Sequence, residues 1–584
     1  MCGFTVIIKK NKSKKIDESL KRKILLSQKH RGPDNSRILE KKNMIFFHNR
    51  LSIIDLSQKA SQPMTCKKTG NIIVFNGEIY NFKELKRNYL NNEMFETDSD
   101  TEVILKLYNL FKENIHKYLN GIFSFVIYDC EKNKLFLIRD RFGVKPLVYY
   151  EDKEFFVCST EIRSINLLRG KVDLNFSNIR EYLKFGLIHH NDRTFYTKIR
   201  TFKPSTFKIY DLNKEKIIHN EKYWELKKNR SFIQKNYEDF KAAYNTYFEN
   251  SLKRNLTSDV PVALLLSSGA DSTYLYKNLN KLGYDNMNSF SFGWGNKKYD
   301  ESLLTKKILN LNSKSHKILK IDFKNFFSDL SKAIEYNEGP IGGFGTLGIF
   351  KLMKLIRDYG YKVTLSGEGS DELNLGYFNL NLSFLIDNLK SNKKEFNKFC
   401  KVNKIKNDIK YLKKKFLSDN VYAPDGTELG ERSKTKVSFN TDQLTRYYLF
   451  KIKLPKLLHW QDKCSAAFGI ETRVPFLDHD LATFVYSNPN KFKIRNLVSK
   501  SHIRDNKNMN IPKKFVPTPQ RETLKKMSAS ILEILDNGHL VKENLINFEK
   551  FKKDYRKYKK SNELGNSFFI WKLLNLELFM SNFK

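Results

Sequence analysis

The spacing of hydrophobic residues divides the chain into two regions. In the first 212 residues, short apolar runs such as Asn71–Phe75 and Lys134–Ile138 are separated by turn residues, a pattern that predicts buried β-strands. A helical pattern at Asp100–Phe111 lies between these runs. We therefore expect the first region to be a mixed domain built mainly from strands.

From residue 237 onward, predicted strands alternate with helices. Strand patterns at Val260–Leu266, Asn288–Phe292, Lys317–Ile321 and Tyr361–Leu365 are separated by long helical patterns. This alternation favours a doubly wound parallel sheet, in which ligands bind beyond the carboxyl ends of the strands. The last third of the chain is mostly helical. The fold class predicted for the whole chain is α/β.

This change of pattern also predicts the domain boundaries. We expect one domain at 2–212, a polar, lysine-rich linker at 213–236, and a second domain at 237–584. Each domain is long enough to have a hydrophobic core of its own.

The formal net charge of +41 raises the question of nucleic-acid binding, because clustered Lys and Arg bind phosphate backbones. The 105 basic residues are spread over the whole chain, and lysine far outnumbers arginine. That distribution favours a compositional bias over a specific nucleic-acid site. Weak adhesion to polyanions is still expected from the charge alone.

Neither a membrane anchor nor a disulfide framework is predicted. No apolar run approaches the roughly 20 residues that a bilayer-spanning helix needs, and the first ten residues lack a signal-peptide core. The six cysteines show no CxxC spacing, and the eleven histidines show no metal-ligand pattern. We expect a reduced, cytoplasmic protein.

Cys2 carries the first candidate chemistry. Once Met1 is trimmed, Cys2 becomes the N-terminal residue, with a thiol nucleophile and a free α-amine that can act as its general base. An α-amine pKa of about 7.7–8.0 leaves a useful neutral fraction near pH 7. Most residues at position 2 have no such role, so the interpretation depends on the motifs that follow.

Five motifs follow Cys2 in order, and each has a plain structural explanation when taken alone. Asn76-Gly77 is a strong hairpin signal, and Arg50 and Asp100 could be solvated surface charges. The five motifs are Arg31-Gly32-Pro33-Asp34, His48-Asn49-Arg50-Leu51-Ser52, Phe75-Asn76-Gly77-Glu78-Ile79-Tyr80-Asn81, Ser99-Asp100-Thr101-Glu102 and Arg139-Asp140-Arg141-Phe142-Gly143-Val144-Lys145-Pro146.

Together with Cys2, these motifs resemble the glutaminase domain of class II glutamine amidotransferases. The whole chain resembles the glutamine-hydrolysing asparagine synthetases. The resemblance implies an N-terminal-nucleophile hydrolase fold, a four-layer α/β/β/α sandwich. It also implies that Cys2 is the nucleophile, and that the Asn76 side chain and the Gly77 amide form the oxyanion hole.

The same resemblance implies how glutamine is held. Arg50 is expected to bind the α-carboxylate, because a guanidinium can pair with it through two hydrogen bonds. Glu78 and Asp100 are expected to bind the α-ammonium, with Asn76 and Gly77 completing the glutamine site.

The second candidate site follows an apolar strand in the second region. Leu264-Leu265-Leu266-Ser267-Ser268-Gly269-Ala270-Asp271-Ser272 reads as a strand, a turn of small residues and the start of a helix, an arrangement that binds phosphate. It lacks the Gly-Lys-Ser/Thr ending of a Walker A loop. It resembles the Ser-Gly-Gly-x-Asp-Ser pyrophosphate loop of enzymes that split ATP into AMP and pyrophosphate. Ser268 replaces the first glycine of that pair, and a serine at positive φ would cost about 1 kcal/mol.

The resemblance implies further roles in this half. Asp271 and Asp371 are the expected Mg²⁺ ligands, Lys500 is expected to stabilise charge on the reacting phosphate, and Glu368 to support acyl-adenylate formation and proton handling. Gly469–His479 is expected near the acceptor pocket. The residues implied in ATP binding are Leu265, Ser267, Gly269, Asp271, Ser272, Phe292, Ser366 and Gly367.

The reaction implied is glutamine-dependent asparagine synthesis from aspartate and ATP with Mg²⁺. Glu338–Gly343 and Thr518–Glu522 resemble a sub-group less securely tied to aspartate, so another carboxylate, such as a sugar acid of a surface polysaccharide, stays open as the acceptor.

The expected partners are glutamine, aspartate and ATP, with neither a specific nucleic acid nor a membrane, and a homodimer stays open. A glutamine-sensing relative with a damaged ATP loop is the alternative that Ser268 suggests, and a basic nucleic-acid binder is the one that the charge suggests.

Overall fold

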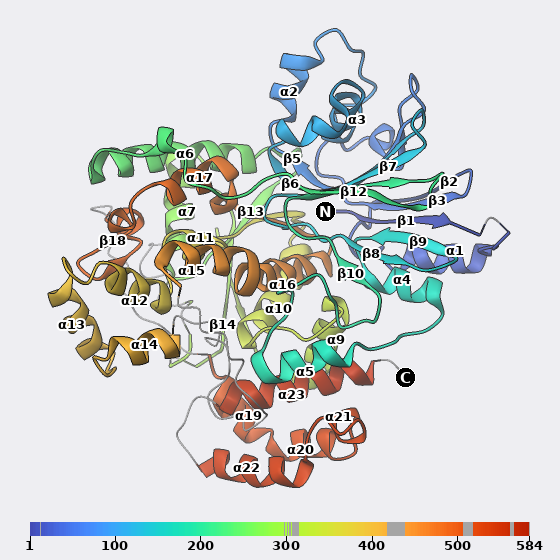
Figure 1. Cartoon of the computed structure of the whole chain (residues 1–584). Helices are drawn as coiled ribbons and strands as arrows, with labels where there is room; N and C mark the ends of the chain where they lie inside the picture. Colours follow the sequence, from blue (N-terminus) through green and yellow to red (C-terminus); the bar gives the residue numbers. More distant parts are fainter. Residues whose placement is uncertain are drawn as a thin grey trace.

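The computed structural model describes residues 1–11, 13–296, 298–300, 302, 305, 315–416, 439–505, 518–560 and 566–582. These residues form two domains in close contact, the first rich in strands and the second built of alternating strands and helices (Figure 1). The predicted α/β class is confirmed.

The first domain contains two six-stranded antiparallel sheets. The first sheet has the order β10 (Arg200–Thr201), β8 (Val148–Glu151), β9 (Phe155–Ser159), β1 (Gly3–Lys9), β3 (Met44–Arg50), β2 (Asn35–Lys41). The second has the order β12 (Lys216–Lys222), β11 (Thr206–Asp211), β7 (Lys134–Arg139), β6 (Gly121–Asp129), β5 (Ile72–Ile79), β4 (Met64–Thr65).

The two sheets face each other across a hydrophobic core, and helices cover their outer faces. Phe4 and Phe46 of the first sheet pack with Val74 and Val126 of the second, and all four are fully buried. Helices α1 (Glu18–Leu26) and α4 (Ile162–Arg169) contact the first sheet, and α3 (Asp100–Phe111) contacts the second with α2 (Phe82–Tyr89) against it (Figure 1). This is the expected four-layer α/β/β/α sandwich.

The second sheet extends into the span predicted as a linker. Strand β12 pairs with β11 along its whole length, with a register shift at Ile209/Tyr210. Its lysines and glutamate are exposed at the sheet edge, where charged side chains discourage edge-to-edge pairing. An extended segment and a short 3-10 turn (Arg230–Phe232) then lead to α6 (Tyr237–Asn255).

The second domain is organised around a five-stranded parallel sheet. Its order is β15 (His316–Lys320), β14 (Ser289–Gly293), β13 (Val262–Leu265), β16 (Val363–Leu365), β17 (Glu471–Arg473). The strand order reverses between β13 and β16, which makes the gap beyond their carboxyl ends the topological switch point, where such sheets bind ligands.

Helices cover both faces of this sheet, as the alternation of its apolar residues requires. Leu264 packs toward α6, α7 (Ala270–Lys281) and α17 (His479–Ser487). Its neighbour Leu265 points to the opposite face, toward α10 (Phe344–Asp358). Helices α9 (Phe326–Asn337) and α16 (Leu454–Ala466) pack beside α10.

The rest of the second domain is helical, as predicted. One group packs around Leu380 and Leu444, and another around Trp571. The first group is α12 (Phe378–Asp387), α13 (Lys393–Val402), α14 (Ile409–Phe416) and α15 (Thr441–Tyr447). The second is α19 (Gln520–Lys526), α20 (Ser528–Asp536), α21 (His539–Lys542), α22 (Phe548–Lys560) and α23 (Asn566–Ser581). Among the helices described, none has both the length and the apolar character needed to cross a bilayer.

A buried ion network joins the two domains. Arg31 of the first domain pairs with Asp462 of α16 at 3.0 Å, and Lys463 pairs with Glu161 at 2.9 Å and with Glu338 at 2.6 Å. Because breaking one partner of a buried pair leaves an uncompensated charge, this network fixes how the domains meet.

Candidate active sites

The first candidate site lies where β1, β3, β5 and α3 meet. Cys2 directly precedes β1, Arg50 ends β3, and Asp100 begins α3. The Cys2 main-chain nitrogen donates to Asn76 Oδ1 at 2.8 Å, so the prospective α-amine is held against the predicted oxyanion residue. Burial raises the pKa of the Cys2 thiol, while Leu51 and Arg50 work in the opposite direction.

Asn76 and Gly77 lie inside strand β5, not in a hairpin turn. Gly77 has φ +143°, and a Cβ there would lie 2.0 Å from the carbonyl oxygen of Ile122 on β6. Only glycine fits this close approach of two strands. Asn76 Nδ2 is buried and has no hydrogen-bond partner among the described residues, so it is free to donate to an oxyanion.

Arg50 is oriented by main-chain carbonyl groups. Its guanidinium donates to Ser57 O at 2.7 Å, to Ile54 O at 3.2 Å and to Asp55 O. These bonds hold a cation beside Cys2 without neutralising it, which leaves its charge available to a carboxylate.

Glu78 and Asp100 form a buried acidic pair. Burial, together with Glu471 and Asp100, raises the pKa of Glu78 well above its usual range. Burial also raises the pKa of Asp100 to about 7, although its carboxylate accepts from the Ile79 amide at 3.0 Å. Glu78 Oε2 has no partner among the described residues. An ammonium group would satisfy this oxygen and offset the cost of burying it.

Strand β17 of the second domain reaches this site, which the sequence did not indicate. Arg473 lies 3.5 Å from Glu78 and 2.9 Å from Glu471, and Glu471 in turn pairs with Lys145 at 3.2 Å. The Met1 ammonium lies 3.3 Å from the same Glu471 carboxylate. Burial opposes ionisation of Glu471, but Lys145, the chain terminus and Arg473 hold its pKa below the usual range.

Glu471 and Arg473 belong to the Gly469–His479 segment, which the resemblance places near the acceptor pocket, and their side chains contact residues of the first candidate site. In a strand, successive side chains point to opposite faces. Thr472, between them, bonds Thr364 at 2.9 Å and lies beside Gln461, which lines the second candidate site. One three-residue strand thus contacts both sites.

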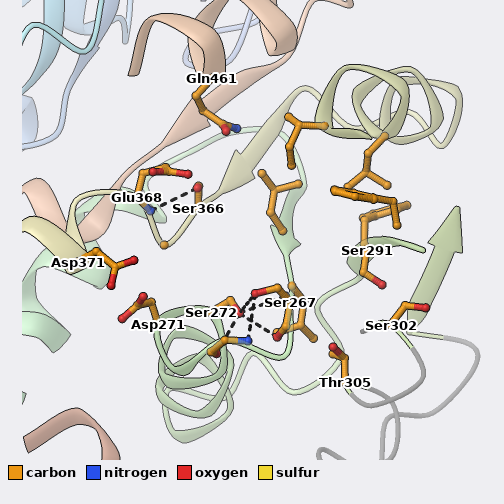
Figure 2. Close-up of a pocket in the computed structure, with 18 of the residues that line it drawn as sticks. Ser267, Asp271, Ser272, Ser291, Ser302, Thr305, Ser366, Glu368, Asp371 and Gln461 are labelled. Atoms are coloured by element: carbon orange, nitrogen blue, oxygen red, sulfur yellow. Dashed lines mark hydrogen bonds between the residues drawn. The ribbon is translucent and has the colours of Figure 1, made fainter. Parts of the chain in front are cut away.

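The second candidate site is a pocket of about 210 Å³ at the switch point between β13 and β16 (Figure 2). The loop after β13 and the loop after β16 face each other there. Gly367 allows this approach, because a Cβ on it would lie 3.1 Å from the Asp271 side chain. Every residue implied in ATP binding lines the pocket: Leu265, Ser267, Gly269, Asp271, Ser272, Phe292, Ser366 and Gly367.

The loop after β13 closes on its own side chains. Ser272 Oγ donates to Ser267 O at 2.9 Å, and the Gly269 amide donates to Ser267 Oγ at 3.2 Å. Ser268 is not among the residues with positive φ, and Gly269 has φ −70°. The expected backbone strain at Ser268 is therefore absent, and with it the motive for reading the loop as damaged.

Asp271 and Asp371 converge on one cation. Lys500 Nζ lies 2.6 Å from Asp271 and 2.5 Å from Asp371, although Lys500 itself is only 3% exposed. Burial opposes the charge, but the two carboxylates raise the pKa of Lys500. The two carboxylates reach the same cation position, so they could also coordinate one Mg²⁺ ion, which prefers such hard oxygen ligands.

Glu368 lies on the pocket wall among other carboxylates. Burial, followed by Glu372 and Asp371, raises its pKa to about 8, and burial raises the pKa of Glu372 to about 7. Glu368 is therefore mostly protonated at neutral pH in this structure. A carboxyl group with a pKa near the working pH is suited to transferring protons.

The two segments that suggested an unusual acceptor pack against each other. A Cβ on Gly343 would lie 3.0 Å from Gln520 Oε1, which also accepts from the Phe344 amide at 3.3 Å, and Trp571 Nε1 of α23 donates to Gly342 O at 2.5 Å. Gly342 lies so close to Trp460 that a Cβ would meet the ring at 2.8 Å. Helix α10, which begins at this contact, contributes Ile349 and Leu352 to the pocket wall.

Comparison with known proteins identifies the family. Residues 1–224 match the model of a glutamine amidotransferase domain, and residues 243–581 match that of asparagine synthase. The chain belongs to the asparagine synthase family. It carries a glutamine amidotransferase domain at its N-terminal end.

Curated relatives share modest identity with this member of the asparagine synthase family. Asparagine synthetase [glutamine-hydrolyzing] 3 of Bacillus subtilis is 27% identical over 86% of this chain and 84% of its own length. The Gallus gallus asparagine synthetase [glutamine-hydrolyzing] is 27% identical over 85% and 78%. A Gibberella zeae protein named amidase chry2 is also 27% identical, over 60% and 54%.

Among solved structures, a glutamine phosphoribosylpyrophosphate amidotransferase from B. subtilis matches 49% of this chain and 65% of its own. The TM-score is 0.30 and the sequence identity is 15%.

Proposed function

We propose that this protein is a glutamine-dependent asparagine synthetase. In this proposal it hydrolyses glutamine at Cys2, forms β-aspartyl-AMP from aspartate and MgATP, and transfers ammonia to give asparagine, AMP and pyrophosphate. The observation that carries the proposal is that one chain places a buried N-terminal thiol site and a switch-point pocket on either side of strand β17.

In the glutaminase half, the Cys2 thiol attacks the glutamine amide and the α-amine takes its proton. Asn76 Nδ2 and the Gly77 amide stabilise the oxyanion. Arg50 binds the α-carboxylate, and Glu78 with Asp100 binds the α-ammonium. The unpartnered Asn76 Nδ2 and Glu78 Oε2 support these roles, since each lacks a partner among the described residues.

In the synthetase half, the loop after β13 and the Ser366–Gly367 turn bind ATP at the carboxyl ends of the strands. Asp271 and Asp371 would hold Mg²⁺, which supplies charge neutralisation on the phosphates when bound. Lys500, already between the two carboxylates, stabilises the negative charge that develops on the α-phosphate. Glu368 holds or releases the proton of the incoming amine.

Amidation of a different carboxylate is the second candidate function. The charged residues among the described lining of the pocket are all acidic: Asp271, Glu368, Asp371 and Glu372. An aspartate acceptor presents an α-carboxylate that needs a cation or several N–H donors. An acceptor whose only carboxylate is the reacting one, such as a sugar acid of a surface polysaccharide, needs no such cation or set of N–H donors.

Product analysis distinguishes the two functions. With glutamine, MgATP and aspartate, we expect asparagine, AMP and pyrophosphate in equal amounts. Glucuronate serves as the matched sugar acid. Amide formation on glucuronate and none on aspartate would overturn the aspartate proposal and support the second function. Glutamate release without AMP in either mixture would overturn both.

A further inference from the structure

A separate cavity of about 530 Å³ lies at the domain interface and contains none of the residues of the two candidate sites. Residues of strands β8, β10, β11 and β12 of the first domain line one side. The opposite side comes from Phe450 and Lys451 and from helix α16 with Pro455, His459 and Lys463. A ligand here would touch both domains.

Arg139 contributes a positive charge to the cavity wall that no described carboxylate pairs with. Its guanidinium donates to the carbonyl oxygens of Lys145 at 2.7 Å, Phe202 at 2.5 Å and Gly143 at 2.7 Å. Neutral carbonyl groups orient the cation without neutralising it, and two of its five N–H bonds remain.

Lys208 is a second such cation. It is only 8% exposed, and no described carboxylate lies at ion-pair distance from its ammonium group. The ammonium lies 4.0 Å from the centre of the Tyr149 ring and 4.8 Å from that of Phe202. Burial lowers its pKa to about 8. A buried and a partly buried cation on one wall, neither in an ion pair with a described carboxylate, are costly unless an anion binds there.

The acidic residues of the cavity are already paired. Glu338 pairs with Lys463 at 2.6 Å, and Asp192 pairs with Arg200 at 3.3 Å. Asp192 also favours the charge of Lys208 from beyond ion-pair distance, and neither carboxylate of the lining forms an ion pair with Arg139 or Lys208. The cavity therefore carries an excess of positive charge.

Two further features indicate the kind of anion. Lys203 and Lys451 line the cavity from opposite domains, and both are exposed to solvent. The wall also contains Phe142 and Phe450, stacked 5.8 Å apart. Several cations beside an apolar surface suit a phosphate group attached to a ring, and the volume accommodates a nucleotide or a sugar phosphate.

We propose that this interdomain cavity binds a phosphorylated small molecule, with the phosphate between Arg139 and Lys208 of the first domain and Lys451 of the second. Because both domains contribute contacts, the bound molecule stabilises their association. The proposal concerns binding alone and does not depend on the acceptor or on turnover.

The test is isothermal titration of the full-length protein with AMP, glucose 1-phosphate or inorganic pyrophosphate, without added metal. The Lys500→Gln variant has an altered ATP pocket and an unaltered interdomain cavity. At least one probe is expected to bind to this variant with the same affinity as to wild type. Lys208→Gln should weaken that binding roughly tenfold or more. Which probe binds distinguishes a nucleotide, a sugar phosphate and a bare phosphate site.

Two variants keep this test decisive. Lys216→Gln, at an exposed position of neighbouring β12, is the matched control and should bind like wild type. Lys451→Gln alters the second domain's contribution at an exposed position and should weaken binding about threefold. Lys208→Gln without a probe should melt no lower than wild type, since it removes a buried, unpaired charge. Equal affinity of wild type and Lys208→Gln for every probe, or no binding of any probe to Lys500→Gln, would overturn the proposal.

Discussion

Cys2→Ala is expected to lower glutamine-dependent amide formation by at least about 10³-fold and to leave ammonium-dependent amide formation unchanged. The substitution removes the only thiol beside Arg50 and Asn76 in the described structure, and with it the nucleophile. It leaves the switch-point pocket intact, because no lining residue of that pocket comes from the first domain. Alanine at this position also keeps the main-chain nitrogen that bonds Asn76.

Cys158→Ala is the matched control for this experiment. Cys158 is fully buried on β9 and pairs with Val6 of β1, so its loss affects packing of the same sheet without touching the site. The control should retain both activities. Loss of ammonium-dependent activity in Cys2→Ala, or retention of glutamine-dependent activity, would contradict the role of Cys2. Mass spectrometry of the wild-type chain should show that Met1 is absent, since the role needs a free α-amine.

Glu368→Gln is expected to lower amide formation about 100-fold or more while stabilising the fold. Burial and the neighbouring carboxylates raise the pKa of Glu368 to about 8, against an ordinary value of 4.5. Between these pH values the folded state holds a proton that the unfolded state has lost. The free energy of unfolding therefore falls as pH rises through this window.

The glutamine amide that this substitution introduces does not titrate. The free energy of unfolding of the variant therefore does not fall over this pH range as that of the wild type does. The melting temperature of the variant should match that of wild type near pH 4.5, exceed it increasingly up to about pH 8, and then keep a constant difference. We expect the free energy of unfolding of the variant to exceed that of wild type by on the order of 2 kcal/mol at pH 8. The neighbouring carboxylates, which titrate together with Glu368, keep the difference at this size. Glu395→Gln, at an exposed position on α13, should show no such trend. A gain that is independent of pH would contradict the buried-proton account.

The sequence predicted those elements whose signal is local. The helix Asp100–Phe111 has the predicted bounds, with Ser99 capping it through the Glu102 amide at 3.3 Å. Four strands of the parallel sheet lie within two residues of their predicted ends. Strands β13 and β16 are short, mainly apolar runs that are almost wholly buried, and such runs are visible without tertiary information.

The fifth strand was not predicted, because Glu471–Arg473 has only three residues and two of them are charged. These charges are tolerated inside the protein because Lys145, Met1 and Glu78 of the other domain compensate them. That compensation is a tertiary property. Strand β12 was missed for a similar reason, since its lysines resemble a linker until pairing with β11 is known.

Sequence motifs predicted which residues belong to the candidate sites, but they did not predict the contacts or the backbone conformation of those residues. Spacing gave no sign that Lys500 lies between Asp271 and Asp371, which are far apart in sequence. Nor did it show that the backbone at Ser268 is unstrained, or that the Asn76-Gly77 pair sits within a strand. These three features depend on how segments that are distant in the sequence pack together in the folded protein.

Transfer of labelled nitrogen tests the central claim most directly. Wild-type protein is given [amide-¹⁵N]glutamine, MgATP and the acceptor found by product analysis, with unlabelled ammonium in the solution. The account predicts that most of the product amide carries ¹⁵N, with one AMP and one pyrophosphate for each amide formed. Labelled ammonium released without AMP, or product amide drawn from the solution pool alone, would contradict the coupling of the two sites in one enzyme.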